Sequence, residues 1–235
     1  DAEYYFTESY EAAKQINDIN QMALALTEKG IVLAIEKQTT QAIELLLEAK
    51  KLFQSVNSLD GIGQAFLQLG VIYEAAMSYP LAELQYTNSL ENFKKSGNEL
   101  QLSNVYELIG NLSFLQGNLN KAIDNINKSI RLRKGLKMIE ESIPSYRLLA
   151  NIYTEKGVLD SAIDNYNKYL FLVDDFKEKE NSKKIAELSE IYRSEQRDLI
   201  ISRQADSLEK QIREKQLTEA KLENSSLKND LQTYV

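Results

Sequence analysis

Apolar residues recur along most of the chain at the three- and four-residue spacings of amphipathic helices. Two adjacent rows illustrate these spacings. The first row is Phe66, Leu69, Ile72 and Tyr73, and the second is Ala82, Tyr86, Ser89, Leu90 and Phe93. The polar and helix-breaking run Ser78-Tyr79-Pro80 separates them, and proline is tolerated at a helix start but not inside a helix. The pattern therefore predicts two helices joined by a tight turn.

This plan repeats with a fixed period along the chain. Small residues stand 40 positions apart at Gly30, Gly70, Gly110 and Ala150, and each is followed twelve residues later by Ala42, Ala82, Ala122 or Ala162. Four units with small residues at the same two places predict an all-α stack of helical hairpins. A glycine inside a helix costs about 1 kcal/mol relative to alanine. We therefore expect close approach of two helices at these glycines to offset that cost.

The edges of the repeat predict the domain organisation. Ala2 and Phe6 stand 40 residues before Ala42 and Leu46, so residues 1–16 read as the second helix of a truncated hairpin. Four hairpins are expected over residues 17–176. A fifth would place Glu190 at the small position, so the repeat is expected to end and residues 177–235 to form a long, charged helix. The missing first helix suggests that the chain comes from a longer protein.

The repeated residues resemble the tetratricopeptide repeat (TPR) family, whose pattern is best matched by Phe66, Gly70, Tyr73, Ala82 and Tyr86. The family's usual period is about 34 residues. The chain therefore resembles a variant lengthened to 40 residues, over about residues 1–176. The resemblance implies a right-handed superhelix of hairpins that binds a protein or peptide.

In TPR solenoids the first helices of successive hairpins line a concave groove. The resemblance places the groove at Thr27, Ile31, Ala34, Ile35, Leu67, Val71, Glu74, Asn104, Glu107, Asn111, Phe114, Arg147, Asn151 and Glu155. This set changes from apolar to polar along the array, which predicts a peptide with one apolar and one polar end. Arg147 and Asn151 resemble half of the carboxylate clamp of some TPR domains, and ordinary groove lining is the alternative.

The last part of the chain carries a sparse apolar row at coiled-coil spacings, with a break in register after Ile212. The row is Ile201, Ala205, Leu208, Ile212, Leu217, Ala220, Asn224, Leu227 and Leu231. It predicts the seam of a homodimeric coiled coil. The alternatives are a single solvated helix and a helix that folds back on the solenoid.

Composition argues against catalysis in this chain. The 235 residues include no cysteine and no histidine, which removes thiol nucleophiles, the commonest general base and the commonest metal ligand. We expect no enzyme activity, no metal site and no cofactor. The net charge of -7 argues against nucleic-acid binding. Gly61-Ile62-Gly63 lacks the third glycine of a phosphate-binding loop, so we expect a turn between hairpins there.

The stretch KKIAELSEIY and the charged sequence after it are similar in organisation to a segment of bacterial sensor proteins. That segment joins periplasmic TPR arrays to a membrane anchor and then to a histidine kinase or a DNA-binding domain. The resemblance implies the periplasmic, sensory part of an inner-membrane signalling protein. Binding in the groove would change the curvature of the solenoid, and the C-terminal helix would relay the change. The alternative is a free-standing cytoplasmic TPR scaffold. No run of 18 apolar residues occurs, so no membrane span is expected in this chain.

Overall fold

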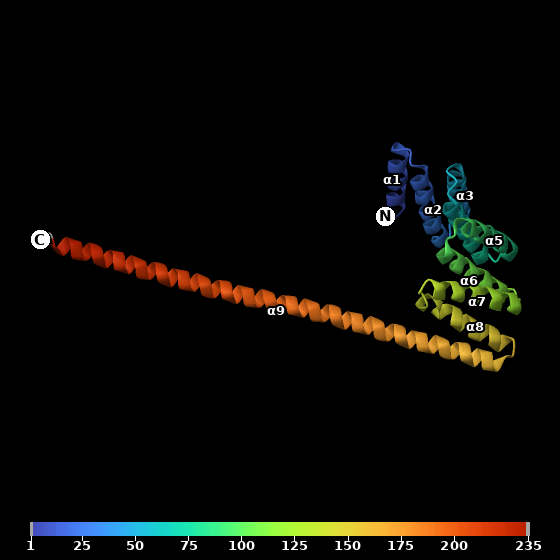
Figure 1. Ribbon diagram of the computed structural model, residues 1–235. Helices are drawn as coiled ribbons and strands as arrows, with labels where there is room; N and C mark the ends of the chain where they lie inside the picture. The colour runs from blue at the N-terminus through green and yellow to red at the C-terminus, as the bar shows by residue number, and fades with distance from the viewer. Residues whose placement is uncertain (1, 234–235) are drawn as a thin grey trace. The chain divides into compact units, whose positions relative to one another are not determined.

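The structure, a computed structural model, describes the backbone of residues 2–233 and the side chains of residues 5–194, 197–198, 201–202 and 205. All regular secondary structure in this part of the chain is helical, which confirms the predicted all-α class (Figure 1). The elements are α1 (Ala2–Gln15), α2 (Ile19–Ile35), α3 (Thr39–Ser55), α4 (Leu59–Ala75), α5 (Tyr79–Ser96), α6 (Glu99–Leu115), α7 (Leu119–Gly135), the short 3-10 helix η1 (Glu140–Ser142), α8 (Ile143–Glu155) and α9 (Leu159–Thr233).

Consecutive helices pack as hairpins. The pairs α2–α3, α4–α5 and α6–α7 form three of them, and α1 packs on α2 (Figure 1). The second helix of a hairpin also packs on the first helix of the next one. Leu46 of α3, for example, shares a buried cluster with Leu69 and Ile72 of α4. The core is therefore a series of clusters between hairpins, and each helix layer depends on its neighbours.

The chain divides into two compact units. The first ends at Asp174, close to the expected end of the repeats at residue 176, and the second comprises Asp175–Val235. α9 is 75 residues long and continues through this boundary as one helix. No proline or glycine follows Gly157, so no strong helix breaker interrupts α9.

The same turn follows each helix from α1 to α8. One residue in each turn has a left-handed conformation, and these residues are Asn17, Lys37, Asn57, Met77, Gly97, Gly117, Lys137 and Gly157. The amide of the next residue donates to a carbonyl five residues back, as from Ser78 to Tyr73 at 2.8 Å. This is the bond of a Schellman motif. In four turns the side chain of the same residue also caps the next helix, as Ser58 does by accepting from the amide of Gly61.

The helical glycines meet the partner helix closely, as expected. A Cβ added at Gly70 would lie 2.5 Å from Cδ1 of Tyr86, and one at Gly110 would lie 2.5 Å from Cδ1 of Ile126. At Gly30 the approach is milder, with Cγ of Leu46 at 3.1 Å. The side chain of the second helix thus occupies the space that a Cβ on the first helix would need.

The expected turn at Gly61-Ile62-Gly63 is wrong, because these residues are buried inside α4. A Cβ at Gly61 would lie 2.1 Å from Phe53, and one at Gly63 would lie 2.8 Å from Phe93. The two glycines therefore make room for aromatic rings of α3 and α5. Ser58 caps the helix just before them, so the turn lies earlier in the chain than the glycines suggest.

The fourth hairpin begins differently from the others. α8 has 13 residues, whereas α2, α4 and α6 have 17 each. η1 replaces its first turn, and Pro144 lies in the first turn of α8. Proline has no amide hydrogen to donate, so it favours a helix start at this place.

Replacing Met77 with glycine should stabilise the protein. Met77 is exposed and has a φ of 57°, a conformation that costs a residue with a Cβ about 1 kcal/mol or more. We expect Met77→Gly to raise the free energy of unfolding by about 1 kcal/mol in urea denaturation. The control is Gly97→Ala at a φ of 75°, which should lower it by a similar amount. Unchanged midpoints in both variants would contradict the proposed strain.

Adding one methyl group should distinguish two of the helical glycines. Gly70→Ala places a Cβ against the Tyr86 ring, and overpacking of this kind lowers the free energy of unfolding by about 1–3 kcal/mol. Gly30→Ala places its Cβ at a milder distance, 3.1 Å from Cγ of Leu46 and 3.4 Å from the carbonyl oxygen of Ala42, and gains about 1 kcal/mol of helix propensity. We therefore expect a small net change for Gly30→Ala. Equal losses in the two variants, measured by thermal unfolding, would rule out the packing explanation.

Candidate functional site

An apolar cavity lies between the C-terminal halves of α2 and α4. Its volume is about 500 Å³, and we call it the apolar hollow. It is lined by Ile31, Ala34, Ile35, Lys37, Thr39, Leu46, Gln68, Val71, Ile72, Ala75 and Ala76. Four residues predicted for the groove, Ile31, Ala34, Ile35 and Val71, come together here.

The hollow combines a buried base with an exposed rim. Leu46 and Ile72 belong to the packed core, so this side of the hollow is held in place by the hairpins. Ile35 and Val71 are 76% and 38% exposed, so their apolar surface is open to water. Lys37 is the single charged residue in the lining. The chemistry of this surface suits an apolar side chain rather than a charged group.

Two of the expected groove residues lie in the interior instead. Thr27 is only 1% exposed, and its hydroxyl donates to the carbonyl of Ala23 at 2.8 Å. Leu67 packs with Tyr86 and Phe93 in a buried cluster. Each stands three residues before the glycine of its helix, and residues at this spacing share one helix face. Their side chains therefore face the packed interior with the glycine.

Glu74 and Asn111, also expected in the groove, are hydrogen-bonded to each other, and Glu74 also binds Tyr86. The Glu74 carboxylate accepts from the Tyr86 hydroxyl at 2.7 Å and from the Asn111 amide at 3.0 Å. Burial first, and then the bond to Glu74, raise the pKa of Tyr86 far above its ordinary value, so its hydroxyl stays a donor. These contacts link α4, α5 and α6.

Glu107 and Asn104 hold a buried arginine that the sequence analysis missed. Arg133 of α7 donates to the Glu107 carboxylate at 2.6 Å and to the Asn104 carbonyl oxygen at 3.2 Å. Its other terminal nitrogen donates to the backbone carbonyl of Glu141 and to the Ser145 hydroxyl. The Ser145 hydroxyl in turn donates to Glu107. This cluster links α6, α7 and the start of the fourth hairpin.

A sequence signal for Arg133 exists in the repeat itself. Arg133 stands 40 residues after Phe93, and Glu107 stands 40 residues after Leu67. Phe93 and Leu67 pack together in the core of the preceding hairpin. An ion pair thus occupies the place of an apolar pair. Comparing the hairpins position by position, rather than reading the helix pattern alone, would have exposed it.

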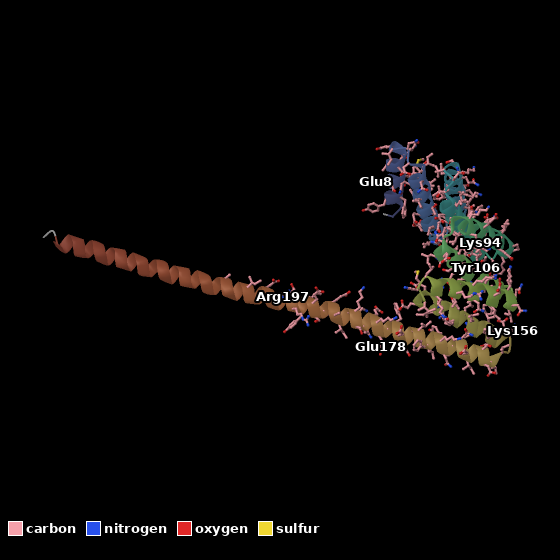
Figure 2. The ribbon with its side chains drawn as sticks, viewed as in Figure 1. Glu8, Lys94, Tyr106, Lys156, Glu178 and Arg197 are labelled. Atoms are coloured by element: carbon pink, nitrogen blue, oxygen red, sulfur yellow. The ribbon has the colours of Figure 1, made fainter. Side chains whose placement is uncertain are left out.

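The remaining groove residues lie toward the C-terminal side of the array. Arg147, Asn151 and Glu155 are exposed on α8, and the carboxylate clamp stays a prediction. Phe114 is half-buried against the cluster formed by α7 and α8. Tyr106 is half-buried and lies near Lys94 (Figure 2). The centre of its ring lies 5.9 Å from Nζ of Lys94 and 5.5 Å from Nζ of Lys128.

The expected dimer seam is described only at its start. Ile201 and Ala205 are exposed on α9. The side chains of Leu208, Ile212, Leu217, Ala220, Asn224, Leu227 and Leu231 lie outside the described side chains. The seam stays a prediction. Among the side chains that the structure describes, no group of three or more acidic residues is placed to hold a metal ion. The described helices include none that is long and apolar enough to cross a bilayer.

Breaking the buried ion pair should be costly, and restoring the apolar pair should repair the loss. Glu107→Leu leaves the Arg133 charge buried, which should lower the free energy of unfolding by about 3 kcal/mol. Glu107→Leu with Arg133→Phe reproduces the Leu67–Phe93 pair and should recover most of that loss. Urea denaturation measures both.

The matched control for these two variants is the half-exposed ion pair of Glu83 and Lys121. Glu83→Leu should change the free energy of unfolding by less than about 1 kcal/mol. A double variant no more stable than Glu107→Leu alone would show that the Arg133 contacts to Asn104, Glu141 and Ser145 matter more than its pairing with Glu107.

No protein-family model matches the sequence, and no curated protein matches it. Solved structures do resemble it. BtubC (BKLC) from P. vanneervenii has a TM-score of 0.66 at 15% identity, over 73% of this chain and 72% of its own. A Rap protein complexed with Competence and Sporulation Factor has a TM-score of 0.65 at 13% identity, over 75% of this chain and 50% of its own.

The TPR-like repeats of a Podospora anserina putative kinesin light chain have a TM-score of 0.55 at 13% identity, over 74% of this chain and 89% of their own. At these identities the likeness concerns the fold. The chain therefore has the helical-hairpin solenoid fold of TPR proteins.

Proposed function

We propose that the hairpin solenoid binds a peptide or a segment of another protein, and that the apolar hollow takes an apolar side chain of that partner. The observation that carries the proposal is the pairing of a core-supported base with the exposed Ile35 and Val71. Burying one leucine-sized side chain contributes about 1.5–3 kcal/mol. That energy corresponds to roughly a tenfold to hundredfold gain in affinity.

The polar end of the array supplies the second part of the proposed binding surface. Arg147 and Asn151 lie one helical turn apart on α8 and are exposed, with Glu155 one turn further on. A guanidinium and a side-chain amide can bind a carboxylate or a peptide backbone. A partner with an apolar anchor at one end and polar groups at the other fits this order. The Rap structure of similar fold was solved as a complex with Competence and Sporulation Factor, which supports the proposal by analogy alone.

The larger role that we propose is sensing in a bacterial signalling protein. In this role the solenoid lies in the periplasm as part of an inner-membrane protein, and α9 relays partner binding. The unbroken helical backbone of α9 supports a relay because a continuous helix transmits displacement along its axis. The alternative is a free-standing cytoplasmic scaffold. Reading the gene around this chain separates them: an adjoining apolar stretch of about 20 residues supports the sensor. A gene that encodes no such stretch supports the scaffold.

Peptides selected for binding to the protein should owe much of their affinity to the apolar hollow. We expect a displayed library of random peptides to yield binders with a shared apolar residue. Val71→Asp should weaken them by about tenfold or more, since it places a charge where that residue is buried. Fluorescence anisotropy with labelled peptides measures the effect.

The matched control replaces an exposed apolar residue elsewhere on the solenoid. Leu84 of α5 is exposed and is absent from the lining of the hollow, so Leu84→Asp should leave peptide affinity unchanged. Equal weakening by the two substitutions, with both variants folded by circular dichroism, would overturn the proposed site. A selection that enriches no peptide would do the same.

A further inference from the structure

The second helix of each of the first three complete hairpins carries apolar side chains that the next hairpin covers. Leu46, Tyr86 and Ile126 stand 40 residues apart on α3, α5 and α7, and all three are 0% exposed. The equivalent residue on α9 is Tyr166, which is 49% exposed. The last hairpin therefore lacks the cover that each earlier one has.

The uncovered residues form one row on the first part of α9, within the unit that ends at Asp174, and we call it the end row. It consists of Leu159, Ile163, Tyr166 and Leu170, all of them exposed. Their spacings of four, three and four residues place them on one helix face. α9 continues to Thr233 as one helix, so no turn follows the row at which a covering helix could begin. Solenoids ordinarily end in a polar face, so an apolar row at the end of this array is a docking surface.

The earlier hairpins show what covers such a row. Four residues of α7 are the equivalents of the end row, and they pack in one cluster with residues of α8; these four are Leu119, Ile123, Ile126 and Ile130. Each covering helix contributes to its cluster two large apolar residues three positions apart. These pairs are Leu69 and Ile72 of α4, Ile109 and Leu112 of α6, and Leu149 and Ile152 of α8. The cover that fits the end row is therefore an amphipathic α-helix.

Charge further defines the helix that fits the end row. Residues 119–134 of α7 carry five basic residues and one acidic residue, and residues 140–155, which form η1 and α8 and cover α7, carry three glutamates and one arginine. A basic second helix is thus covered by an acidic segment. Residues 159–174 of α9 have the opposite balance, with three aspartates and one lysine. A basic helix is therefore the complementary cover for this part of α9.

We propose that the end row binds a basic amphipathic helix of a partner protein, which covers the last hairpin as α8 covers α7. Two apolar residues of this helix, three positions apart, contact Tyr166 and its neighbours in the row. Its basic side chains approach Asp160 and Asp174, which are exposed and stand three residues before Ile163 and four residues after Leu170, so they lie beside the row. The end row differs from the apolar hollow in its occupant, because it takes a whole helix and the hollow takes one side chain.

A labelled helical peptide, titrated with the full chain, tests this proposal by fluorescence anisotropy. The probe has the sequence of α6, residues 99–115, whose Ile109 and Leu112 cover α5 in the second hairpin. Glu99→Lys and Glu107→Lys make the probe basic, and a hydrocarbon staple on its outer face keeps a peptide of this length helical. We expect a dissociation constant on the order of 10 µM. The same stapled peptide with both glutamates retained should bind about threefold more weakly, and high salt should reduce this difference.

Two substitutions on the same helix locate the bound probe. Ile163→Lys places a charge in the end row, and it should weaken binding of the basic probe by about tenfold or more. Phe171→Lys makes the same change of charge at an exposed residue outside the end row, and it should change the affinity by less than about twofold. Val71→Asp in the apolar hollow should leave this affinity unchanged, so failure of this proposal is distinguishable from failure of the proposed peptide site.

Three results would overturn the proposal. The first is no binding of the basic probe at about 200 µM protein. The second is equal weakening by Ile163→Lys and Phe171→Lys, with both variants folded by circular dichroism, because the probe would then bind outside the end row. The third is a dimer of the chain alone, measured by light scattering, that Ile163→Lys converts to a monomer, because a second copy would then cover the row. Equal affinity of the basic and the acidic peptide would overturn the basic character of the partner.

Discussion

The close approach of paired helices at a small residue is the contact on which the array depends. Tyr86 and Ile126 pack where a Cβ on Gly70 or Gly110 would clash, so the glycines let the two helices of each hairpin approach closely there. The same side chains then pack against the next hairpin, as Tyr86 does with Val105 and Leu112. One residue on the second helix therefore holds its own hairpin together and also provides the surface for the next hairpin.

This arrangement explains where polar groups enter the interior. Between the first hairpins the contacts are apolar, and the neighbouring rim of α2 and α4 forms the apolar hollow. Further along, Glu74 joins Tyr86 to Asn111, and Arg133 replaces an aromatic ring and binds Glu107. The Glu74 carboxylate and the terminal nitrogens of Arg133 are tolerated there because they find partners on adjacent helices, although Nε of Arg133 has no hydrogen-bond partner among the described residues. We expected the residues along the groove to change from apolar to polar. Part of this change lies in the interior instead, where the polar side chains hold the stacked hairpins together.

Local signals made most of the fold predictable from sequence. Helix periodicity and the turn residues act within a few residues, so they identify the helices. The recurrence of Gly and Ala every 40 residues then pairs these helices into hairpins. The side-chain direction of Thr27 and Leu67 was not predictable in this way, because it depends on how each helix is rotated against its neighbours. Gly61 and Gly63 were misread for the same reason, since their role depends on the distant rings of Phe53 and Phe93. Arg133 was missed because its partners come from three other segments.

The central claim is that a partner side chain enters the apolar hollow between α2 and α4. Methyl NMR of the full chain, titrated with a selected peptide, tests it most directly. The account predicts shifts of the Ile31, Ile35 and Val71 methyl groups at the same peptide concentration, with those of Leu84 unchanged. Shifts of Leu84 without shifts of Ile35 and Val71 would contradict it.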